Sequence, residues 1–178
     1  ADMLAEALAE HGFDIEDVEA VVVTHQDVDH AGCLADVVAE SDATVYAHEA
    51  DAPYVEGERE LIKSSEERPM SYEGVPVDVQ LVGGETFRTA AGPLDVVHTP
   101  GHTPGHCSLF LRDAGLLFAA DALNVEDGEL TGPRERATPD VETARESVET
   151  LAGLDVREVL CYHGGRIDAN ADDVAALR

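Results

Sequence analysis

The stretch Thr24-His-Gln-Asp-Val-Asp-His-Ala-Gly32 is the part of the chain from which the fold and the function can best be inferred. It places four side chains that can bind a metal within six positions: His25, Asp27, Asp29 and His30. Single Asp and His residues are common in a polar loop, where solvent surrounds them. Four of them together indicate a metal site.

The segments on either side of this stretch predict where it lies in the fold. Residues 20–23 are short, apolar and β-branched, which indicates a buried strand of a parallel sheet. Residues 33–40 carry apolar side chains at helical spacing. The four residues are therefore predicted in a strand-to-helix loop, where His25 and Asp27 can face one point and the other two a second point nearby.

The rest of the chain mixes helical and strand patterns. Helices are predicted at residues 3–13, 139–151 and 171–178, and strands at 43–47, 77–82, 86–89, 94–98, 108–112, 116–120 and 157–161. Thr138 is the predicted cap of the 139–151 helix, with Pro139 at its first position. With 178 residues, the chain is predicted to form a single α/β (α+β) domain, residues 1–178.

Residues 49–74 form a long polar stretch with Pro53, Gly57 and Pro69. Only residues 59–63 suggest a short helix within it. Long loops in compact domains are usually functional, which favours a lid or substrate-side flap. A mobile insertion is the alternative that the composition leaves open.

Further candidate ligands follow later strands. Paired Pro-Gly turns make the loop Thr99-Pro-Gly-His-Thr-Pro-Gly-His106 rigid, and a rigid loop suits a ligand at His102. Asp121 directly follows a buried strand, where an acid is costly unless it is paired or binds metal. His163 also follows a strand. The histidines beside the loop, His98 and His106, are interpreted as supports of the site rather than ligands.

Charge and cysteine content restrict the setting. The chain has 38 acidic and 11 basic residues, a net charge of −27, and Lys63 is its only lysine. Such a surface is typical of cytoplasmic proteins of extreme halophiles and disfavours nucleic acid and anionic membranes. No membrane span or signal peptide is visible. Three cysteines without finger spacing are predicted to be small buried residues in a reducing cytoplasm.

Read together, these motifs resemble those of the metallo-β-lactamase-fold hydrolases. The order is His-x-x-x-Asp-His, then Pro-Gly-His-Thr-Pro-Gly, then an aspartate ending a strand, then a late His-Gly-Gly, over residues 21–165. The resemblance implies an αββα sandwich with one or two ions between its sheets. It also implies the ligands: His25, Asp27 and His102 for one ion, Asp29, His30 and His163 for the other, and Asp121 bridging both.

The chain departs from the family pattern at two places. Asp27 stands where the usual motif has histidine, as in a subset with His-Gln-Asp-x-Asp-His. We expect two divalent ions, zinc first, while the oxygen donor of Asp27 leaves iron or manganese open. The family also places several strands before the first ligands, and only some twenty residues precede them here. The fold is therefore expected to lack its N-terminal strands, unless an oligomeric partner supplies them.

The resemblance implies a metal-dependent hydrolase of a small ester, thioester or lactone that uses a metal-bound hydroxide. Asp29 would orient the water or pass its proton to the leaving group, and Asp121 would hold both ions. Asn124 stands where quorum-quenching lactonases place a tyrosine. A mono-iron persulfide dioxygenase of the same fold and a non-catalytic binding module are the alternatives. The expected partner is a small-molecule substrate, with no nucleic acid and no membrane.

Overall fold

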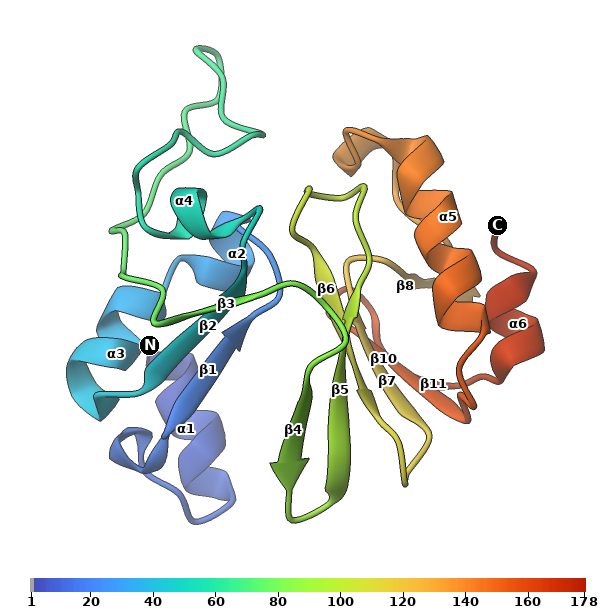
Figure 1. Cartoon of the computed structure of the whole chain (residues 1–178), viewed down its shortest axis with the longest axis horizontal. Helices are drawn as coiled ribbons and strands as arrows, with labels where there is room; N and C mark the ends of the chain where they lie inside the picture. Colours follow the sequence, from blue (N-terminus) through green and yellow to red (C-terminus); the bar gives the residue numbers. More distant parts are fainter. Residues whose placement is uncertain (1) are drawn as a thin grey trace. The chain divides into compact units, whose positions relative to one another are not determined.

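The apolar run at residues 20–23 forms the first strand of a parallel sheet, as its composition predicts. The computed structural model describes residues 2–178, which divide into two compact units, residues up to Leu81 and residues Val82–Arg178 (Figure 1). The predicted single domain, the lid at residues 49–74 and the missing front strands stay predictions.

The first unit is a three-stranded sheet with helices. Its elements are α1 (Asp2–Glu10), η1 (Ile15–Asp17), β1 (Ala20–Val23), α2 (Val28–Ala31), α3 (Leu34–Ser41), β2 (Thr44–His48), α4 (Ala52–Val55) and β3 (Val79–Leu81). The strands lie in the order β1-β2-β3, and both pairs are parallel. Leu34 of α3 packs with Val23, Val45 and Ala47 of the strands, which fixes the end of β1 where the first ligands follow.

The second unit is built on a six-stranded sheet. Its elements are β4 (Thr86–Thr89), β5 (Gly92–His98), β6 (Cys107–Leu111), β7 (Leu116–Ala120), β8 (Asn124–Glu126), β9 (Glu129–Thr131), η2 (Glu135–Ala137), α5 (Val141–Ala152), β10 (Glu158–Cys161), β11 (Gly165–Asp168) and α6 (Ala171–Ala175). The order is β11-β10-β7-β6-β5-β4, with only β7 and β10 parallel, and β8 and β9 form a separate hairpin.

The core of the second unit lies between its large sheet and two helices. Val148 and Leu151 of α5 and Val174 of α6 pack against strand residues that include Leu117 and Val159. Within this unit, α5 and α6 lie beside each other on the same side of the sheet (Figure 1). The apolar side chains of α5 lie on the face that packs in this core, because residues three and four positions apart share one face of a helix.

Four local predictions were wrong. Residues 59–63 form no helix, with a turn only at residues 62–63, and the short helix of this segment is α4, with Pro53 in its first turn. Asp29 and His30 lie on α2 and not in a loop. The cap of α5 is Asp140, whose carboxylate accepts the Thr143 amide, and not Thr138. The strands β8, β9 and β11 were also missed.

Among the described residues, none of the helices has both the length and the apolar character that crossing a membrane requires.

Candidate metal centre

The first unit gathers the four motif residues where β1 ends. His25 is fully buried, and its ring lies 3.9 Å from that of His30 between centroids. The Thr24 hydroxyl lies 3.2 Å from Nδ1 of His25 and 3.3 Å from Nδ1 of His30. When Nδ1 of a histidine is held in this way, Nε2 is the nitrogen presented to a metal. Thr24 therefore orients two imidazoles of the predicted set.

Asp27 lies next to His25 and to a cation. Its Oδ2 lies 3.6 Å from Nε2 of His25 and 2.5 Å from Nζ of Lys63. The two side chains of the Asp27–Lys63 pair are both mostly buried, at 16% and 17% exposed. Asp29, by contrast, is exposed on the first turn of α2. The structure thus gives the two aspartates of the motif different surroundings.

Gln26, between the ligands, is the centre of a buried polar network. Asp51 accepts its backbone N–H at 3.0 Å and its side-chain amide at 3.2 Å. On its other side, Gln26 Oε1 accepts the Ile62 amide at 2.9 Å, and its carbonyl accepts the Tyr72 hydroxyl at 2.9 Å. Burial, and then the carboxylates of Asp51 and Asp27, raise the pKa of Tyr72, so this hydroxyl keeps its proton and acts as a donor.

The second unit holds His102 on the predicted Pro-Gly loop. His102 is buried, and the loop approaches α5 so closely that a Cβ on Gly101 would lie 2.4 Å from the Ala144 nitrogen. Gly101 also has φ +125°, which favours glycine. Ser147 donates to the Pro100 carbonyl at 2.7 Å and ties the loop to the same helix. The rigidity expected from the sequence therefore comes from packing on α5 as well as from the turns.

Two imidazoles of this unit converge on one carboxylate oxygen. Oδ2 of Asp121 lies 3.4 Å from Nε2 of His102 and 3.5 Å from Nε2 of His163. Two donors that bind one ion tetrahedrally at about 2.1 Å lie about 3.4 Å apart. The spacing on each side of Asp121 thus fits a metal, and imidazole and carboxylate are donors that zinc accepts. His163 is half-buried, and Gly164 after it packs so tightly on Val125 that a side chain there would clash.

A chain of hydrogen bonds supports the backbone of Asp121. The Asp121 amide donates to Nε2 of His106 at 3.1 Å, so the proton of this buried imidazole is on Nδ1, which donates to Thr99 Oγ1 at 2.8 Å. Thr99 then donates to Ser108 at 3.1 Å, and Ser108 to the Ala119 carbonyl at 3.2 Å. Every hydroxyl proton in this chain is used once. His106 therefore supports Asp121 through its backbone, in line with the sequence prediction that it is not a ligand.

The backbone just before Asp121 is strained. Ala120 has φ +48°, a left-handed conformation that costs a residue with a Cβ about 1 kcal/mol or more. The pairing of β7 with β10 also shifts register beside it, between Leu160 and Cys161. Asp121 directly follows this departure from regular strand geometry, at the end of β7, and strain of this kind is typical of functional sites.

The cysteines agree with the prediction of small buried residues at two of three positions. Cys107 and Cys161 are buried, and Cys33 is half-buried. Burial, and then the Asp121 carboxylate, raise the pKa of the Cys161 thiol to about 12, so it is not a thiolate at neutral pH.

Each unit therefore holds one part of the predicted ligand set. The first brings together His25, Asp27, Asp29 and His30, and the second His102, Asp121 and His163. The sequence reasoning missed Thr24, Asp51, Tyr72 and Lys63 as neighbours of the ligands. Lys63 alone carried a signal, since it is the only lysine of an acidic chain.

The chain is similar in sequence to known proteins. A family model described as the metallo-beta-lactamase superfamily matches residues 1–163. The chain is 33% identical over 173 residues to the probable metallo-hydrolase YflN of Bacillus subtilis, covering 83% of this chain and 64% of the relative. It is 27% identical over 151 residues to the thioesterase pkgB of Emericella nidulans, covering 84% of this chain and 35% of the relative.

A solved structure is similar over almost the whole chain. The metallo-beta-lactamase family protein TTHA1429 from Thermus thermophilus matches with a TM-score of 0.71 and 25% identity, covering 98% of this chain and 65% of that one. The predicted fold is thus confirmed. The chain spans less than two thirds of the length of this structure and of both relatives.

Proposed function

Because the chain belongs to the metallo-beta-lactamase superfamily, we propose that it takes part in metal-dependent hydrolysis of a small thioester, ester or lactone. The observation that carries the proposal is the placement of the Asp121 carboxylate oxygen 3.4 and 3.5 Å from two imidazole nitrogens. A thioester is the first substrate class to test, because one relative is named a thioesterase.

The proposed ligands are the seven residues predicted from the sequence. His25, Asp27 and His102 would hold one ion, Asp29, His30 and His163 the other, and Asp121 both. The donors are nitrogen and oxygen without sulfur, which favours zinc, and the oxygen of Asp27 keeps iron or manganese as alternatives. When bound, such ions lower the pKa of a water to near neutral and polarise the substrate carbonyl.

The residues of the chain would then orient the reactants and move the proton. Asp121, fixed by His106 and by the strained turn at Ala120, would keep its carboxylate in place without further ordering. Asp29 is exposed, so its carboxylate can reach a water or a leaving group and accept or pass on a proton. Asp121 would thus be the fixed metal ligand, and Asp29 would transfer the proton.

The net charge of −27 supports the further proposal of a halophilic, cytoplasmic protein whose partner is a small molecule rather than nucleic acid or an anionic membrane.

The experiment is a substrate panel at molar potassium chloride with zinc present. Thioesters, lactones and phosphate-free esters are assayed together with oxygen uptake on glutathione persulfide. The variants are His163→Ala, Asp121→Asn and a control, His11→Ala, which removes an exposed imidazole after α1. We expect ester or thioester cleavage that only the first two variants abolish. Oxygen uptake that survives His163→Ala, with no cleavage by the wild type, would overturn the proposal in favour of the dioxygenase.

A further inference from the structure

Lys63, the only lysine of the chain, forms an ion pair with the predicted metal ligand Asp27. Nζ of Lys63 lies 2.5 Å from Oδ2 of Asp27, and both side chains are mostly buried. Arginine ion pairs of the described residues lie at the surface, as in Arg157 with Asp155, whose side chains are 62% and 80% exposed. Surface pairs contribute little to stability. The Lys63–Asp27 pair is therefore more buried than these arginine pairs.

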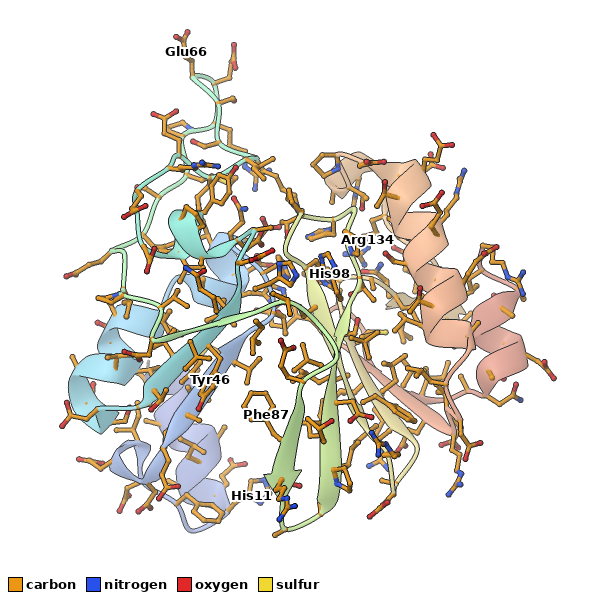
Figure 2. All side chains as sticks on the ribbon, in the orientation of Figure 1. His11, Tyr46, Glu66, Phe87, His98 and Arg134 are labelled. Carbon is orange, nitrogen blue, oxygen red and sulfur yellow. The ribbon has the colours of Figure 1, made fainter. Side chains whose placement is uncertain are left out.

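Lys63 belongs to a segment that is hydrogen-bonded to Gln26, the residue before Asp27, at two points. The amide of Ile62, its neighbour, donates to the side chain of Gln26, and the Tyr72 hydroxyl donates to the Gln26 carbonyl. Between these two contacts the segment runs outward, and Figure 2 shows Glu66 at its tip, away from the sheet of this unit. The ion pair thus belongs to the base of a loop docked on residues 26–27.

A metal and an ammonium group need the same oxygen of Asp27. Oδ2 lies 3.6 Å from Nε2 of His25, which is close to the separation of two ligands of one ion, about 3.4 Å. The same oxygen already accepts a charged donor from Lys63. Two cations on one carboxylate oxygen repel each other, and little water separates charges that are mostly buried.

We propose that Lys63 competes with the metal for Asp27, so that metal binding releases Lys63 and loosens the base of the loop at residues 61–64. Lys63 is then a positioning residue that couples the metal content of the centre to the docking of the segment above it. The inference rests on the proposed function only in taking Asp27 as a ligand, and its test does not depend on turnover.

The first test is the affinity for zinc, measured by competition with a chromophoric chelator at fixed salt. The variant is Lys63→Met, and the matched control is Arg68→Met, which removes one positive charge from the exposed part of the same segment. A fivefold change in affinity corresponds to about 1 kcal/mol of binding free energy. We expect Lys63→Met to bind the tightest zinc ion about fivefold more tightly than the wild type, and Arg68→Met to stay within about twofold of it.

The second test uses the wild type alone and so does not depend on the folding of a variant. Hydrogen exchange of the Ile62 and Ser64 amides, which are bonded at 2.9 Å to Gln26 and Leu61, is compared with and without saturating zinc. We expect faster exchange with zinc at these two amides, while amides of α1 (Asp2–Glu10) are unchanged. Slower or equal exchange would overturn the proposal.

The outcomes separate this inference from the proposed function. Weaker zinc binding by Lys63→Met would mean that Lys63 supports Asp27 as a ligand. Equal zinc binding would mean that Lys63 and the metal do not compete for Asp27. Either result overturns the competition and leaves the hydrolase proposal standing. A wild type that binds no zinc overturns both.

Discussion

Replacing His106 with leucine should loosen Asp121 without removing any ligand. The substitution leaves the buried Asp121 amide without its acceptor and removes the Nδ1–H group that donates to Thr99. A buried donor left unpaired costs about 1–3 kcal/mol. With about 2 kcal/mol lost, the melting temperature of a chain of this size should fall by about 4–8 °C. Loss of a group that orients a ligand also weakens metal binding by about 10–100-fold.

The assay pairs thermal melts with zinc affinity, and Ser108→Ala is the control. Ser108 lies at the far end of the same hydrogen-bond chain and donates to the Ala119 carbonyl, so its loss should lower stability by about 1 kcal/mol and leave zinc affinity unchanged. If His106→Leu binds zinc as tightly as the wild type, the idea that His106 fixes Asp121 is wrong. Equal loss of zinc affinity in both variants would also refute it, since the effect would then follow stability alone.

Further predictions concern strain, acid and salt. Ala120→Val should lower the free energy of unfolding, measured by urea titration, by about 2 kcal/mol, because Ala120 has a left-handed φ of +48°. Ala120→Gly relieves this strain and should stay within about 1 kcal/mol of the wild type. Equal losses in the two variants would refute the strain. The hydrogen bonds from Arg112 lower the pKa of Asp95 from its ordinary value of 3.8, so the pair stabilises the fold above that pH, and its contribution is lost as the pH falls through the lowered pKa. As the pH is lowered below 3.8, the melting temperature of Arg112→Met should therefore fall less steeply than that of the wild type, and parallel curves would contradict this. At a net charge of −27, melting temperatures should rise steeply with potassium chloride, and a flat profile would exclude the halophile proposal.

Local patterns in the sequence were sufficient for most of the fold. The run at residues 20–23 predicted β1 because β-branched residues in a short apolar run suit a buried parallel strand. The hairpin of β6 and β7 followed from two apolar runs around Gly115. The short strands β8, β9 and β11 escaped prediction, because they have three or four residues each and little apolar periodicity.

Candidate ligands could be picked out of the sequence where a polar side chain has few structural uses, and they stay predictions. Asp121 stood out because an aspartate after a buried strand is costly without a partner, His102 because paired Pro-Gly turns make its loop rigid, and His163 because it follows a strand. The neighbours of the ligands were different. Lys63 is far from Asp27 in the sequence, and only tertiary structure brings the pair together. The strain at Ala120 was also hidden, since alanine itself has no preference for a left-handed conformation.

The most direct test of the account is the metal content of the protein, measured by elemental analysis after purification without chelator or a nickel column. We expect up to two divalent ions per chain in the wild type, zinc first, and a clear loss in Asp121→Ala, because the Asp121 carboxylate would contact both ions. The His11→Ala control should keep the wild-type content. A wild type that carries no more metal than Asp121→Ala would contradict the central claim.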